Sequence, residues 1–240
     1  LVHGWSHKLA ATIRPQRKGD EGMSSIVLIR PGCTDYDEQS RLLGALEMPM
    51  NDAGLEQVQA IIRHLQQNDI KLEAIFASPL APASSTARAI VESQRGVKVK
   101  ELEELRNVDQ GLWQGLPEAD VRKRYPRVFR NAREKPQTIC PPEGESLSDA
   151  CERIQKVLNK GIRKYDVFAV VVADPIATVI RCTLQDRCPT VASCLCGEDD
   201  RPAVEVFQAD SFDFNSFLKS EQCGEPAPVT ADTSTQGSAP

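Results

Sequence analysis

Long apolar runs, long basic runs and aromatic residues are scarce in this chain of 240 residues. No stretch reaches the roughly 18 consecutive apolar residues that a membrane-spanning helix needs, so no membrane helix is expected. The 29 Lys and Arg residues are outnumbered by 34 Asp and Glu residues, which gives a formal net charge of -5. Because the chain is mildly acidic and has no long basic run, neither nucleic acid nor a membrane surface is the expected partner.

Paired cysteine spacings are also absent, although the chain has eight cysteines. A domain of this size does not need a disulfide framework, so reduced structural thiols and a cytoplasmic location are expected. Cys188, Cys194 and Cys196 lie close enough in sequence to suggest a metal, but no Cys-x-x-Cys pair or nearby histidine completes a ligand set. The sequence therefore predicts neither a metal nor a cofactor.

The two ends of the chain differ from its middle. Residues 1–23 contain no clear secretory apolar region, and periodic patterning begins only after Met23. The last twenty residues are rich in Pro, Ser, Thr, Ala and Gly, a composition typical of disorder. We therefore expect one domain over residues 24–210, between a disordered extension (1–23), whose native origin stays open, and a disordered tail (211–240).

Strand and helix patterns alternate within this domain. Apolar runs of strand length predict buried strands at 26–29 and 167–173. The other expected strands are 74–77, 97–99 and 203–207, the last at an edge of the sheet. The expected helices are one beginning at Asn51 or Asp52, then 84–93, 146–164 and 175–185. This alternation favours a three-layer α/β/α sandwich with a mostly parallel sheet.

Two of these helices carry specific signals. Ser146, with Asp149 three residues later, resembles a capping box. In the helix that begins at Asn51 or Asp52, one face is apolar and is expected to pack on the sheet. The residues on that face are Leu55, Val58, Ile61, Ile62 and Leu65.

Ligands of open parallel sheets bind beyond the carboxyl ends of the strands. Residues 30–34, 78–82 and 174–176 follow three of the predicted strands. We therefore expect any chemistry of this chain to lie there.

Several motifs, in the same order, resemble one protein family. The segment Arg-Pro-Gly-Cys-Thr at 30–34 resembles the Arg-His-Gly-x-Thr signature of the histidine phosphatase superfamily, the phosphoglycerate mutase-like proteins. Residues 78–87, 111–115 and 144–147 resemble its Ser-x-Leu-x-Arg-Ala-x-x-Thr-Ala, Gly-x-Trp-Glu-Gly and Gly-Glu-Ser motifs. Residues 170–181 resemble the strand and helix around the family's second histidine. The resemblance implies a phosphoglycerate mutase-like fold.

The resemblance also implies which groups the family's reaction needs. One histidine attacks phosphorus, two arginines and a second histidine neutralise the phosphoryl oxygens, and a carboxylic acid protonates the leaving oxygen. At the positions of the nucleophile, the second arginine, the acid and the second histidine, this chain has Pro31, Pro82, Asn107 and Asp174. The parts of the phosphate pocket that remain are Arg30, Gly32 and Thr34.

Asp174 would place a carboxylate where a phosphate dianion should sit. Two unit charges 4 Å apart repel by about 4 kcal/mol at an effective dielectric constant of 20. One arginine offers about 1.5–3 kcal/mol in return as a charge-assisted hydrogen bond. We therefore predict that Asp174 turns towards Arg30, pairs with it and closes the remnant pocket.

These substitutions predict a catalytically inactive family member that acts by binding or regulation. Its partner would be either a phosphorylated small molecule or a protein, and nothing in the sequence indicates the oligomeric state. The alternative is a phosphomonoesterase or mutase with a rearranged active site, in which Cys33 or Asp174 replaces the lost nucleophile.

Other chemically capable residues have ordinary structural interpretations. Cys33 lacks the Cys-x5-Arg loop of thiol phosphatases, and a small packed residue is expected there. His64 lies beside the apolar helix face and is expected to be solvated or partly packed, while Trp113 is expected to pack under a loop. A basic run is expected to form a solvated helix, with an acidic or phosphate-bearing partner as the alternative. It comprises Arg122, Lys123, Arg124, Arg127, Arg130 and Arg133.

Overall fold

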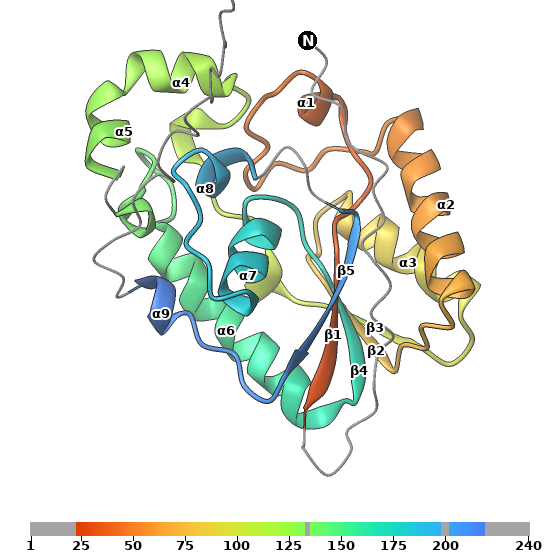
Figure 1. Cartoon of the computed structure of the whole chain (residues 1–240). Helices are drawn as coiled ribbons and strands as arrows, with labels where there is room; N and C mark the ends of the chain where they lie inside the picture. Colours follow the sequence, from red (N-terminus) through yellow and green to blue (C-terminus); the bar gives the residue numbers. More distant parts are fainter. Residues whose placement is uncertain (1–22, 133–134, 198–201, 219–240) are drawn as a thin grey trace, which may run out of the picture.

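A five-stranded sheet forms the middle layer of the computed structural model, which describes residues 23–132, 135–197 and 202–218 (Figure 1). The strand order is β3-β2-β4-β1-β5. The strands are β1 (Ser24–Ile29), β2 (Ala74–Ala77), β3 (Lys98–Glu101), β4 (Val167–Val171) and β5 (Val204–Ala209). The first four are parallel, and β5 pairs antiparallel with β1 at one edge. The predicted three-layer α/β/α fold with a mostly parallel sheet is confirmed.

One face of the sheet is covered by α2 (Asp52–Gln67) and α3 (Ala83–Ser93). Asn51 is the N-cap of α2, because its side-chain oxygen accepts a hydrogen bond from the Gly54 amide at 2.9 Å. The buried residues of α2 include Val58, Ile61 and Leu65, as the apolar periodicity predicts. Leu55 is the exception: it is 52% exposed, so its predicted place on the packed face is wrong.

The opposite face is covered by α6 (Leu147–Lys164) and α7 (Ile176–Leu184) (Figure 1). Ser146 is the N-cap of α6, as predicted, since the Asp149 amide donates to Ser146 Oγ at 3.1 Å. The reciprocal half of the predicted capping box is not formed, because the Asp149 carboxylate accepts from the Ser146 hydroxyl at 2.6 Å and not from the Ser146 amide. Because α7 begins directly after the loop that follows β4, its first turn lies at the carboxyl edge of the sheet.

Short helical segments occupy most of the connections. They are α1 (Asp35–Glu38), η1 (Glu103–Leu105), η2 (Gly111–Trp113), α4 (Glu118–Arg124), α5 (Pro126–Ala132), η3 (Pro136–Thr138), α8 (Ser193–Cys196) and α9 (Asn215–Leu218). Trp113 is fully buried and its ring lies 5.4 Å from that of Tyr125, so the predicted packing role is confirmed.

The ordered fold continues past residue 210. Phe212, Phe214 and Phe217 are buried in the core on the α6 side of the sheet. Two side chains of α6 fix this segment: the Phe212 amide donates to Asn159 Oδ1 at 2.9 Å, and the Phe214 amide donates to Gln155 Oε1 at 2.8 Å. The expected disordered tail is therefore wrong for residues 211–218, while the remaining expected extensions, 1–22 and 219–240, lie outside the described residues.

The expectation that all cysteines are reduced does not hold at one position. Cys188 is disulfide-bonded, so the prediction of reduced thiols is wrong at this position. Six other described cysteines form no disulfide: Cys33, Cys140, Cys151, Cys182, Cys194 and Cys196. Within the described ranges, none of the helices combines the length and apolarity needed to cross a bilayer.

Candidate functional site

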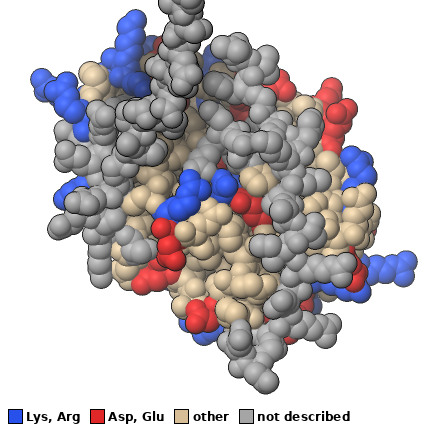
Figure 2. Space-filling view, viewed as in Figure 1, with Lys and Arg blue, Asp and Glu red and all other residues tan. Residues whose placement is uncertain are grey.

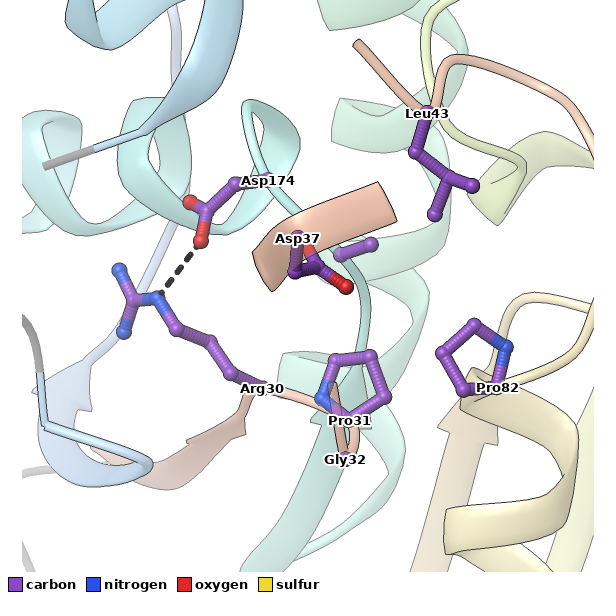
Figure 3. Close-up of a pocket in the computed structure, with 8 residues that line it drawn as sticks. Arg30, Pro31, Gly32, Asp37, Leu43, Pro82 and Asp174 are labelled. Carbon is purple, nitrogen blue, oxygen red and sulfur yellow. Dashed lines mark hydrogen bonds and ion pairs between the residues drawn. The ribbon is translucent and has the colours of Figure 1, made fainter. Parts of the chain in front are cut away.

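The candidate site lies where β1 and β4 end, at the carboxyl edge of the sheet (Figure 3). Arg30 follows β1 and points to the α7 side, because residues alternate faces along a strand and Leu28 packs on that side. Asp174 ends the loop after β4 and precedes α7. The sequence-predicted positions Arg30, Pro31, Gly32, Pro82 and Asp174 are thus brought together around one cavity.

Arg30 is surrounded by hydrogen-bond acceptors of the protein itself. Its Nε donates to Asp174 Oδ2 at 3.2 Å, and its Nη1 donates to Glu205 Oε2 and to the Pro202 carbonyl oxygen, each at 3.0 Å. The Arg30 side chain is only 1% exposed. The predicted pairing of Arg30 with Asp174 is therefore confirmed, and Glu205 is an additional carboxylate partner.

Asp174 is held from its other side by the first turn of α7. Its Oδ1 accepts hydrogen bonds from the Thr178 amide at 3.1 Å and from Thr178 Oγ1 at 2.6 Å. Glu205 in turn forms an ion pair with Arg181 of α7, whose Nε lies 2.9 Å from Glu205 Oε1. Two arginines and two carboxylates therefore neutralise one another, which satisfies the requirement for pairing of buried charges.

Thr34 also forms its hydrogen bonds with a residue of the protein itself, Asp37. Its amide donates to Asp37 Oδ2 at 2.7 Å and its Oγ1 accepts from the Asp37 amide at 3.4 Å, which together form the capping box of α1. The Thr34 hydroxyl also donates to Asp37 Oδ2, at 2.8 Å. The Asp37 carboxylate lines the cavity and adds negative charge there.

Gly32 brings the chain close to the start of α2. A Cβ atom at this position would collide with the Gly54 carbonyl oxygen and with Met50 Sδ. The Gly32 amide donates to Thr86 Oγ1 at 3.2 Å. Close backbone packing thus accounts for a glycine here.

The cavity enclosed by these residues is small. Its volume is about 20 Å³, room for a water molecule but not for a phosphate group with five heavy atoms. Pro31 and Pro82 face it from two sides (Figure 3). Asn107 donates its Nδ2 hydrogen to the Asp174 carbonyl oxygen at 2.7 Å, so this side chain holds the loop that carries Asp174.

Cys33 does not have the environment of a nucleophilic thiol. It is 3% exposed and its Sγ donates to Asn51 Oδ1 at 3.3 Å. Burial, together with the nearby carboxylates of Asp37 and Glu38, raises the pKa of the Cys33 thiol to about 11. At neutral pH this thiol is therefore protonated, whereas attack on phosphorus needs the thiolate.

The described residues include no group of three or more His, Cys, Asp and Glu side chains placed to hold a metal ion. An aspartyl-phosphate mechanism at Asp174 therefore has no metal cluster of carboxylates in this part of the chain to assist it.

The sequence analysis did not predict three residues that contact Arg30 or its carboxylate partners: Thr178, Arg181 and Glu205. Thr178 could have been found, because it lies one helical turn after Asp174, where its amide can be capped. Glu205 carried no such signal, since it lies 175 residues from Arg30.

The remaining candidates lie elsewhere. His64 is buried at 8% exposure and burial lowers its pKa, so the expectation of a solvated or partly packed residue understates its burial. The basic side chains Arg122, Lys123, Arg124, Arg127 and Arg130 are exposed on α4 and α5. Figure 2 shows blue Lys and Arg side chains on the side of the molecule where Figure 1 places these helices. Arg133 of the same run lies outside the described residues.

The comparisons with known proteins agree with this fold. The histidine phosphatase superfamily (branch 1) matches residues 26–188. The chain therefore belongs to the histidine phosphatase superfamily.

Curated relatives include phosphatases and mutases. Phosphoserine phosphatase 1 of Hydrogenobacter thermophilus is 28% identical over 142 residues, which are 59% of this chain and 65% of that protein. A bifunctional protein of Mycobacterium tuberculosis is 30% identical over 186 residues, 74% of this chain and 50% of that protein. The chain thus spans one half to two thirds of the length of these relatives.

Solved structures show the same fold. A mycobacterial hydrolase matches with a TM-score of 0.60 at 26% identity, over 72% of this chain and 85% of that one. A mycobacterial glucosyl-3-phosphoglycerate phosphatase, solved with VO3, matches with a TM-score of 0.58 at 26% identity, over 71% and 86% of the two chains.

Proposed function

We propose that this chain is a catalytically inactive member of the histidine phosphatase superfamily that acts by binding or regulation. One observation carries the proposal: the arginine that would bind a phosphoryl group, Arg30, is neutralised by the buried carboxylates of Asp174 and Glu205. A phosphate dianion would have to displace both carboxylates before it could reach Arg30.

The geometry also argues against a substitute nucleophile. The Cys33 thiol is buried and protonated, and both oxygens of Asp174 accept hydrogen bonds from Arg30 or Thr178. Pro31 and Pro82 offer neither a nucleophile nor a donor to the cavity. A phosphomonoesterase or mutase with a rearranged site therefore stays the alternative that the experiment must exclude.

The small cavity supports a protein partner over a phosphorylated small molecule at this edge of the sheet. A volume of about 20 Å³ is far below the few hundred cubic ångströms of a ligand pocket. A cytoplasmic setting is part of the proposal and rests on the free thiols, with the disulfide of Cys188 as the observation against it.

The test is hydrolysis of an aryl phosphate by the purified protein, with and without divalent metal ions. The Hydrogenobacter phosphoserine phosphatase serves as positive control, and the variants Cys33→Ser and Asp174→Asn serve as matched controls. We expect the wild type to show no turnover above either variant. Turnover that disappears in one of the variants would overturn the proposal and identify the substitute nucleophile.

A contaminating phosphatase is excluded by the same design, because its activity would be equal in all three preparations. Circular dichroism of each variant shows that a loss of turnover does not come from unfolding.

A further inference from the structure

A second group of basic side chains gathers at the β3 edge of the sheet, far from Arg30 in the strand order. Lys100 lies in β3, directly beside Phe76 of β2 in the sheet register. Tyr165 follows the last residue of α6, Lys164. The Lys100 ammonium donates a hydrogen bond to Tyr165 Oη at 3.1 Å, and Lys164 Nζ lies 5.4 Å from the centroid of the same ring. We refer to these three residues as the lysine–tyrosine cluster.

Aromatic packing fixes the position of the phenol. The Tyr165 ring meets the buried Phe76 ring edge-on, with centroids 5.9 Å apart. Lys100 Nζ lies 5.6 Å from the Phe76 centroid and 5.5 Å from the Tyr165 centroid, so the ammonium group itself makes cation–π contacts with both rings. The hydroxyl and the Lys100 ammonium are therefore held in place without a ligand.

The cluster carries positive charge without an acidic partner. Neither Lys100 nor Lys164 forms an ion pair with any carboxylate of the described chain, in contrast to Arg88, which pairs with Glu101 at 2.8 Å. The Lys100 hydrogen bond is the main cause of a lowered pKa of the Tyr165 phenol, and Lys164 acts in the same direction. The two ammonium groups thus lie beside the same phenol, Lys100 at its oxygen and Lys164 near its ring, and an anion would be attracted to both.

We propose that the lysine–tyrosine cluster binds the phosphate group of a phosphate monoester. The two ammonium groups match the charge of a dianion, and they donate hydrogen bonds to its oxygens. The Tyr165 hydroxyl accepts from Lys100 and still has its own hydrogen to donate to the same phosphate. Binding here requires no part of the closed Arg30 cavity.

The experiment is a calorimetric titration of the full chain at low ionic strength, because salt screens exposed charges. Inorganic phosphate is the first probe, and phenyl phosphate the second. If phenyl phosphate binds more tightly than inorganic phosphate, the site also contacts the ester group. If the two probes bind equally, the site contacts the phosphate group alone. Both results support a phosphate contact at the cluster. Absorbance of the Tyr165 phenolate provides a local readout, since a bound dianion raises the pKa of the phenol.

The variants Lys100→Gln and Lys164→Gln are compared with two control variants, Lys156→Gln and Lys160→Gln. The controls remove exposed lysines of α6, the helix that ends at Lys164. We expect each of the first two to weaken phosphate binding by about ten-fold or more, since each removes a charge-assisted hydrogen bond. The control variants should leave the affinity unchanged.

Three results would overturn the inference. The wild type binds neither probe at concentrations up to about 5 mM, or the four lysine variants bind equally well, or binding persists in Lys100→Gln and is lost in Arg30→Gln. The last result would place the phosphate at Arg30, and the proposed inactive site would then be wrong as well. The first two results would leave that proposal untouched.

Discussion

Arg30 and Lys100 are basic residues in two regions of the same sheet, and the charges around them differ. Arg30 lies between the carboxylates of Asp174 and Glu205 and is almost completely buried. Lys100 and Lys164 flank a phenol and have no carboxylate partner within the described chain. Under the two proposals above, the acidic residues around a basic side chain, and not its place in a family motif, determine whether it can bind an anion.

The substitution Arg30→Ala removes the arginine that lies between the two carboxylates. The variant leaves Asp174 and Glu205 buried, with Arg181 as the sole remaining arginine of the network. We expect the free energy of unfolding to fall by about 3–5 kcal/mol, the usual cost of breaking a buried ion pair. Urea denaturation measures this change.

Arg88→Ala is the matched control for that loss. Arg88 is an arginine in an exposed ion pair with Glu101, and removal of such a pair costs about 1 kcal/mol or less. Equal losses in the two variants would show that the Arg30 network does not behave as a buried one.

Thiol reactivity tests how closed the Arg30 region is. A rise of the Cys33 pKa from 9.0 to about 11 lowers the thiolate fraction near pH 8 about one hundred-fold. Iodoacetamide should therefore alkylate the exposed Cys140 and leave Cys33 unmodified, as measured by peptide mass spectrometry.

The pH dependence of this thiol has a definite sign. The folded-state pKa is raised, so the stabilisation from a protonated Cys33 is complete below pH 9 and is lost as the pH rises towards 11. Fast alkylation of Cys33 at pH 8 in the folded protein would contradict the closed geometry and would favour the rearranged enzyme.

The substitution Asp174→Asn tests the role of one carboxylate, because it removes the charge and keeps the shape of the side chain. The amide oxygen can still accept from Thr178, but Arg30 then has a single carboxylate partner, Glu205. We expect a loss of about 1–2 kcal/mol and a melting temperature that rises on addition of phosphate more than that of the wild type. A variant with unchanged stability and unchanged response to phosphate would refute the assigned role of Asp174.

The smallest expected effect concerns Tyr165. In Lys100→Gln the phenol loses the hydrogen bond that favours its ionised form, so its pKa should rise towards the ordinary value. Spectrophotometric titration near 295 nm measures this shift, and Tyr36→Phe provides a background with one other phenol removed. An unchanged titration would mean that Lys100 does not contact the phenol in solution.

Much of the architecture could be predicted from the sequence because it depends on local patterns. The bounds of β2 and the capping of α6 by Ser146 follow from apolar runs and from capping chemistry, and both are confirmed. The Arg30–Asp174 pair could be predicted because each residue directly follows a parallel strand. Parallel strands bring such positions to one edge.

The rest depended on long-range packing that periodicity does not encode. The Val-Glu-Val pattern of β5 gives no sign that Glu205 faces Arg30, and only the antiparallel pairing with β1 brings them together. Leu55 shows a related weakness: helical periodicity assigns a side chain to a face but does not say how much of that face is covered.

The charge network has a consequence for the order in which the chain folds. Glu205 is supplied by β5, which joins β1 from a position 175 residues further along the sequence. Before β5 docks, Arg30 lacks one of its two carboxylate partners, Glu205, and one backbone acceptor, the Pro202 carbonyl oxygen. A partly folded sheet that lacks β5 is therefore expected to keep Arg30 hydrated, so that arrival of the last strand and dehydration of this arginine occur in one cooperative step.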